Sequence, residues 1–381
     1  MRTRSRFPSG LRLRLLAIGL ALALAATVGA AITQASAKFG TSLAAVCPSK
    51  IVVQTDWFPE PEEAGTYQLI GPGGTIDKKK GTYTGEIGKT GVQLEIRAGG
   101  PYIGQQQPVA QMYAHSEIMF GFADTGDQIR NSNKLPTVAV MAPLEKSPVV
   151  LLWDPAHYHF KSFADIKASN ATVLYFEGDV WMQYLLSKGL LNKSQVDGSY
   201  DGSPTRFVSS GGKVVQEGYA TYEVYNYEHN LKKWNKPVNY LLVYNAGYTA
   251  YQSSVVVRPG TITKYGACLK QLIPLWQQAQ VNYIRNPKPV NNEMLQIVKA
   301  LASYWTLTPD GEAAAAKQMQ KLGIVGNGSN GTLGDFDLTR VQKLINEFVP
   351  MFKKANVQTM KAGLKAGDIV TNRFIDPKIH L

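Results

Sequence analysis

The chain has 381 residues and a formal net charge of +12. Its lysines are scattered and lack the interleaved aromatic residues of a nucleic-acid-binding surface, so we exclude nucleic acid as a partner. The part of the chain that follows residue 37 is too long for one core of ordinary size, which predicts two lobes.

The first 37 residues have the order of a secretory signal. Five arginines and no acidic residue precede an uncharged run at 15–32, and residues 35–37 (ASA) then supply a small-residue cleavage site. A retained transmembrane anchor is the alternative, because the run is just long enough to span a bilayer. Since the run is rich in Ala and Gly and no basic stop follows it, we expect cleavage and export. Cleavage would lower the net charge from +12 to +7.

The chain has two cysteines, Cys47 and Cys268. In an exported protein such a pair is expected to form a disulfide. The alternative is that Cys47 carries a lipid, but Val46 is a poor residue before a lipidation site. Only three residues would then separate the lipid from the first strand, so we favour the disulfide.

From residue 51 onward, strands, glycine-containing turns and helices alternate, which predicts βα units on a mostly parallel sheet. Ligands of such sheets bind at the carboxyl ends of the strands. We expect helices at 64–70 and 105–114, and strands at 51–54, 92–96, 118–122 and 137–141.

A second region begins at the apolar strand 149–153. A helix is expected at 180–186, and the C-terminal part from residue 267 is mainly helical, at 268–284, 291–304, 311–322 and 338–352. Further strands of this region are expected at 163–166, 171–176, 207–208, 240–244 and 253–258.

Three kinds of catalytic or metal site are excluded. The chain has no Gly-x-Ser-x-Gly motif, and neither cysteine has a histidine partner in its sequence context. His157 and His159 lack a third ligand at a suitable spacing, and Asp335 and Asp337 are not part of a calcium loop. We therefore expect no metal, no cofactor and no covalent chemistry.

Aromatic and acidic residues gather at the turns that follow strands. The segment 55–67, TDWFPEPEEAGTY, places two rings and three glutamates on a turn made rigid by two prolines. Any one of these residues could simply pack the core, but together they fit a pocket for a planar small molecule. The candidate ligand-binding residues are Trp57, Phe58, Glu60, Glu62, Tyr67, Gly100, Gln105, Asp127, Asp179, Trp181, Glu223, Tyr225 and Tyr251.

The order of these segments resembles the solute-binding proteins that take up thiamine pyrimidine precursors, within the nitrate, sulfonate and taurine binding family of ABC transporters. The resemblance covers residues 51–258 well. It rests on IVVQTDWFPEPEEAGTY, GVQLEIRAGGP, EIMFGFADTGDQI, VAVMAPLEKSPVVLLW, QEGYATYEVY and GYTAYQSSVVVR.

This resemblance implies an α/β, two-lobed, periplasmic-binding-protein-like (type II) fold with two crossover strands. After the signal at 1–37, lobe 1 would hold 38–145, lobe 2 would hold 146–245, and 246–381 would return to lobe 1 and add the C-terminal helices. The implied protein is a monomer that closes on a small-molecule ligand and delivers it to ABC transporter permease subunits. It would touch the membrane only through the permease or through an N-terminal anchor.

The chain departs from the family at two positions of the opening motif. Glu60 and Glu63 replace an Asn and a His of the family, so the implied ligand is richer in hydrogen-bond donors, or cationic. A pyrimidine-precursor synthase of the same superfamily is the alternative, but it would need a pocket histidine, a Schiff-base lysine and a cysteine cluster. An adhesive surface protein is disfavoured because the chain has no repeats.

Overall fold

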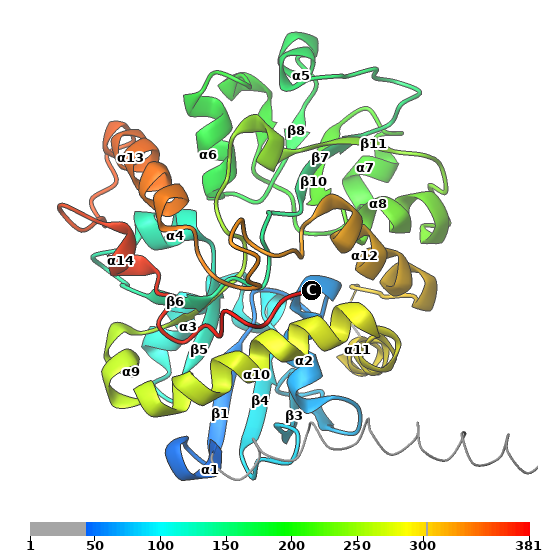
Figure 1. The fold of residues 1–381 in the computed structure, drawn as a ribbon. Coiled ribbons are helices and arrows are strands. Elements are labelled where there is room, and N and C mark those ends of the chain that lie inside the picture. Colours follow the sequence, from blue (N-terminus) through cyan, green and yellow to red (C-terminus); the bar gives the residue numbers. More distant parts are fainter. Residues whose placement is uncertain (1–42, 302–303) are drawn as a thin grey trace, which may run out of the picture.

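The computed structural model describes residues 43–301 and 304–381 (Figure 1). The expected signal, residues 1–37, lies outside the described residues. Within the described ranges, no helix combines the length and the apolar character that a membrane span requires.

The first of two sheets has seven strands in the order β2-β3-β4-β1-β5-β12-β6. β1 pairs in parallel with β4 and β5, whereas β12 runs antiparallel between β5 and β6. The central strands are apolar on both faces, as expected for a sheet covered by helices. The strands are β1 (Lys50–Gln54), β2 (Thr75–Asp77), β3 (Thr82–Glu86), β4 (Gln93–Arg97), β5 (Phe120–Ala123), β6 (Val138–Met141) and β12 (Ser254–Val257).

The second sheet has five strands in the order β11-β7-β10-β8-β9. In Figure 1 it lies above the first sheet, in green. The chain passes between the sheets twice, through residues 142–148 and 247–253. The strands are β7 (Val149–Trp153), β8 (Val173–Leu174), β9 (Val196–Asp197), β10 (Val215–Tyr219) and β11 (Asn239–Leu242).

Helix α10 (Gly266–Arg285) is the long yellow helix that crosses in front of the first sheet in Figure 1. It packs along α2 (Ala64–Ile70), and its buried face includes Leu272, Ile273 and Trp276. The same unit contains α1 (Leu43–Val46), η1 (Pro61–Glu63), η2 (Gly100–Ile103), α3 (Pro108–Ala114), α4 (Thr125–Arg130), α9 (Pro259–Lys264) and α11 (Lys288–Leu301).

The C-terminal helices contact both units, that is, the first sheet with its helices and the second sheet with its helices. α12 (Pro309–Leu322) contacts α8 and η1, and α13 (Leu338–Lys354) contacts α4 and α6. The predicted lobe boundaries therefore stay a prediction, although the first sheet is built from strands within 50–141 plus β12, and the second from strands within 149–242 alone. The remaining elements are α5 (Phe163–Ser169), α6 (Val180–Ser187), η3 (Lys193–Gln195), α7 (Thr205–Ser209), α8 (Glu223–Tyr225), the π-helix η4 (Asn226–Asn230), η5 (Val243–Ala246) and α14 (Ala366–Ile369).

Two expected strands are helices. Residues 163–166 begin α5, because Ser162 and Asp165 form a reciprocal capping box at its start. Residues 207–208 belong to α7. The expected helix at 105–114 begins only at Pro108, since Gln105 adopts a left-handed φ of 60°. β10 and the β2–β3 hairpin were not expected.

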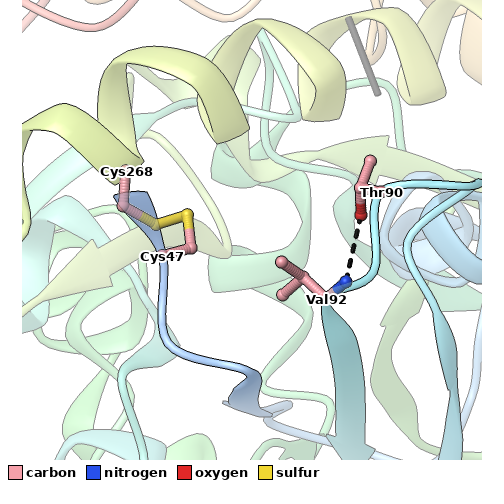
Figure 2. Close-up of a disulfide and its surroundings, with 4 residues drawn as sticks. All are labelled: Cys47, Thr90, Val92 and Cys268. Carbon is pink, nitrogen blue, oxygen red and sulfur yellow. Dashed lines mark hydrogen bonds between the residues drawn. A yellow bond between two sulfur atoms is a disulfide. The ribbon is translucent and has the colours of Figure 1, made fainter. Parts of the chain in front are cut away.

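The two cysteines form a disulfide, shown in Figure 2. Cys47 follows α1, and Cys268 lies in the first turn of α10, with 4.7 Å between their Cα atoms. The bond fastens the segment before β1 to the helix that covers the first sheet.

Candidate functional site

A cavity of about 390 Å³ is lined by residues from both units. From the first unit, Asp56 follows β1 and Asp124 follows β5. From the second, Phe176 and Asp179 follow β8, and Glu217 lies within β10. The cavity is therefore placed largely at the carboxyl ends of strands, which is where α/β sheets bind ligands.

The cavity is strongly acidic. Among the described residues that line it, there are nine carboxylates and no lysine, arginine or histidine. The nine are Asp56, Glu60, Asp124, Asp127, Glu177, Asp179, Asp201, Glu217 and Glu223.

One of these nine acids has a basic partner among the ion pairs of the described residues. Arg130 pairs with Asp127, and its other guanidinium nitrogen donates to the carbonyl of Gly178 at 2.5 Å. Six others accept hydrogen bonds from neutral donors, namely Asp56, Asp124, Glu177, Asp179, Asp201 and Glu217. Trp181 Nε1 donates to Asp179 at 3.0 Å, and the backbone N–H of Phe176 donates to Glu217 at 2.8 Å. Eight of the nine carboxyls therefore have no basic partner among the ion pairs of the described residues.

Ser253 holds two of the acids in place. Its backbone N–H donates to Asp124 Oδ1 and its hydroxyl donates to Asp56 Oδ2, both at 2.8 Å. Its φ of 46° is a left-handed conformation that costs a non-glycine residue energy. Both donors face carboxylates of the cavity wall, so the acid pair is preorganised.

Burial raises the pKa of several lining carboxyls. Burial and then the charge of Glu62 raise the pKa of Glu223 to about 8, and burial raises the pKa of Glu217 to about 7. The pKa of Asp179 is raised well above its usual value by burial and then by Glu217. Near neutral pH, the cavity therefore either retains protons or favours a cation that replaces them.

Aromatic rings form the rest of the wall around Trp57. Its ring meets Phe176 and Trp305 edge to face, at centroid distances of 5.5 and 6.2 Å. Gly100, at φ 55°, lies directly against this ring, because a Cβ there would be 2.9 Å from a Trp57 carbon. Tyr200, Tyr219, Trp181 and Phe122 also line the cavity.

Comparison with protein-family models and with curated proteins gives no match. Solved structures do match. The periplasmic aliphatic sulphonate binding protein of Escherichia coli aligns with a TM-score of 0.55 and 14% identity, over 87% of this chain and 94% of that one. The alkanesulfonate-binding protein of Xanthomonas axonopodis, bound to MOPS, aligns with a TM-score of 0.53 and 11% identity, over 85% and 98%.

The chain has the periplasmic-binding-protein fold. The predicted fold class, α/β with two lobes and two crossover strands, is thereby confirmed, as is the resemblance to sulfonate-binding proteins at the level of the fold. At 11–14% identity this likeness does not extend to the ligand.

Within this fold, seven of the predicted ligand-binding residues come together. They line the cavity from the turns after β1 and β8, from the loop before α3 and from helices α4, α6 and α8. These residues are Trp57, Glu60, Gln105, Asp127, Asp179, Trp181 and Glu223. That they bind a ligand stays a prediction.

The other six predicted residues do not line the cavity. Phe58 and Tyr67 are core residues, at 1% and 2% exposure, and Gly100 supports the Trp57 ring. Glu62 accepts a hydrogen bond from the Thr221 hydroxyl. The last two contact other residues: the Tyr225 ring lies 4.3 Å from the tilted His229 ring, and the Tyr251 hydroxyl accepts a hydrogen bond from the backbone N–H of Asp337.

Several lining residues were not predicted. Asp56 directly precedes Trp57, and Asp124 lies three residues before Asp127 at the end of β5, so the strand-end rule could have included both. Glu217 was missed because strand β10 was not expected. Trp305 lies after α11, far along the chain, and reaches the site by donating from Nε1 to the carbonyl of Pro59 at 3.2 Å.

Proposed function

We propose that this protein is the exported solute-binding component of an ABC importer, and that it captures a small organic cation rich in hydrogen-bond donors. It would bind as a monomer and deliver its ligand to permease subunits. The single observation that carries the choice of ligand is the set of nine lining carboxyls, with no basic residue among the described residues of the lining.

The charge of the cavity argues against an anionic ligand. A sulfonate beside Asp179, Glu217 and Glu223 would oppose their ionisation, because like charges at low dielectric repel, whereas a cation would favour it. The proteins with the same fold named above are sulfonate-binding proteins. This chain would therefore combine their fold with the opposite ligand charge.

The aromatic wall favours a ligand with a flat or apolar body. Trp57, Trp181 and Tyr219 line the same cavity as the acids. A cation held against tryptophan and tyrosine faces is stabilised by their ring electrons, and a planar ring can stack on them. A protonated amino-substituted heteroaromatic ring, of which a pyrimidine is one example, could pair with the acidic residues and stack on the aromatic residues of the cavity.

The described lining residues include no histidine, lysine or cysteine. A pyrimidine-precursor synthase would need all three kinds of residue in its pocket. The composition of the cavity thus supports binding without catalysis over that alternative.

The charge of the ligand can be tested with compounds of one carbon skeleton. In calorimetric titration at pH 8, an arylalkylamine should bind at least about 100-fold more tightly than the matching alcohol, which is about 2.7 kcal/mol. The matching sulfonate should not bind. Native mass spectrometry of the purified protein would identify a co-purifying cation. Tighter binding of the sulfonate than of the amine would reject the proposal.

Replacing Trp57 with alanine should weaken binding of the amine by about 2–3 kcal/mol, because a buried aromatic anchor is lost. Trp57→Phe keeps a ring and should recover part of the affinity. Both variants are measured by calorimetric titration, and their melting temperatures are measured in parallel. Normal binding by Trp57→Ala, together with a much lower melting temperature, would make Trp57 a core residue instead.

A further inference from the structure

We propose that Asp56, Glu60 and Glu63 form a binding site for a hard divalent cation such as Ca²⁺ in the wall of the cavity. Each residue offers one carboxylate oxygen, and these oxygens lie within 4.8 Å of one another. Calcium–oxygen distances are about 2.3–2.6 Å, so two oxygens on opposite sides of the ion lie about 5 Å apart and neighbouring ones lie closer. The spacing therefore fits one ion between the three groups.

Glu63 is the observation that points to a bound ion. Its side chain is 2% exposed, and neither of its carboxylate oxygens has a hydrogen-bond partner. Asp56 Oδ1 is also buried and without a partner. Buried polar atoms are almost always satisfied, and a buried carboxylate with no donor is among the costliest exceptions.

Protons alone do not account for this arrangement. Burial, and then the neighbouring acids Asp56 and Glu60, raise the pKa of Glu63 well above its usual value. One proton shared between Glu63 and Asp56 would remove one charge and leave the others facing each other. None of the ion pairs of the described residues reaches these three acids. A divalent cation offsets two of the three negative charges and gives one oxygen of each carboxylate a partner.

The local backbone holds the three groups in place before any ion arrives. Glu60 and Glu63 flank one turn of η1, which starts at Pro61, and the backbone N–H of Glu63 donates to the carbonyl of Glu60 at 3.0 Å. Asp56 is fixed by the Ser253 hydroxyl on its other oxygen. Oxygen ligands from a rigid turn favour Ca²⁺ or a similar hard ion over the softer metals that prefer sulfur and imidazole.

The site adjoins the ligand cavity without being the same site. Asp56 and Glu60 line the cavity, whereas Glu63 lies behind them and does not. The remaining positions on the ion would be filled by water from the cavity side. Binding of the ion can therefore be measured in the absence of any organic ligand, and its outcome is separate from the test of ligand charge.

Terbium luminescence measures the site directly, because Tb³⁺ replaces Ca²⁺ and Trp57, next to Asp56, can sensitise it. The apoprotein, treated with EDTA and dialysed at pH 7.5, should give tryptophan-sensitised emission that saturates with one Tb³⁺ per chain. Added Ca²⁺ should displace it. Calcium should also raise the melting temperature of the wild-type protein relative to EDTA, which needs no variant.

Glu63→Gln removes one ligand and should weaken Tb³⁺ binding at least about tenfold. Glu312→Gln is the matched control, since Glu312 is equally buried, also has both oxygens unpartnered, and lies outside the triad. It should change binding less than threefold. Equal losses in the two variants would indicate a general charge effect and overturn the site. So would wild-type protein that shows neither Ca²⁺-displaceable emission nor a calcium-dependent melting temperature.

Discussion

Reducing the disulfide between Cys47 and Cys268 should lower the free energy of unfolding by about 5 kcal/mol. The two cysteines are 221 residues apart, so the bond closes most of the described chain into one loop. The chain-entropy account attributes the stabilisation to the restricted unfolded state, and it grows slowly with loop length. Urea unfolding with and without reductant measures the difference.

The double variant Cys47→Ser, Cys268→Ser is the control, because reductant should have no effect on its unfolding midpoint. Intact-mass measurement before and after alkylation should show no free thiol in the oxidised protein. Two alkylated cysteines, or a diacylglyceryl mass on Cys47, would contradict the bond. An unchanged midpoint after verified reduction would show that it contributes little to stability.

The sequence predicted the long amphipathic helices and the apolar strands that end at glycine-containing turns. The helix expected at 268–284 corresponds to α10 and that at 338–352 to α13, because each buries one apolar stripe over several turns. The strands β1, β5 and β7 were likewise found. Predictions from segments of only two to four residues were not reliable. Residues 163–166 were expected to form a strand, but the capping box of Ser162 and Asp165 starts helix α5 there.

The site was only partly predictable, for a physical reason. Strand ends place Trp57, Asp127 and Asp179 at one edge, and the sequence shows strand ends. The sequence does not show which side of a turn faces the cavity. Glu60 and Glu62 are two residues apart, yet Glu60 lines the cavity, whereas Glu62 does not and accepts a hydrogen bond from the Thr221 hydroxyl.

The same limit explains why the proposed cation site differs from the sequence expectation of no metal. A search for calcium loops or histidine triplets looks for ligands at known spacings. The triad of Asp56, Glu60 and Glu63 instead forms because a 3₁₀ turn brings two glutamates back toward Asp56, two residues beyond the end of β1. Its signal is the unpartnered Glu63, which only the packed structure reveals.

The ligand-free protein should become less stable as pH rises from about 5 to 8, and Glu223 should account for much of the loss. The pKa of Glu223 is raised to about 8 by burial and by Glu62, against 4.5 for an ordinary glutamate. Below pH 4.5 the carboxyl is protonated in both the folded and the unfolded states, so it contributes no penalty. Between the two pKa values only the unfolded state loses its proton, so folding loses on the order of 4 kcal/mol by pH 8.

Glu223→Gln tests this prediction because glutamine keeps the shape and cannot ionise. Its melting temperature should exceed that of the wild type at pH 8 and match it near pH 4.5. Glu228→Gln, in the adjacent helical turn but outside the cavity, should show no such difference.

A bound cation should stabilise the wild type more at pH 8 than at pH 5, because it favours the ionised carboxyl. The same variant should bind the amine more weakly, so the charge that destabilises the empty site is the charge that binds the ligand. Stability of Glu223→Gln that follows the wild type at every pH would show that this carboxyl is solvated.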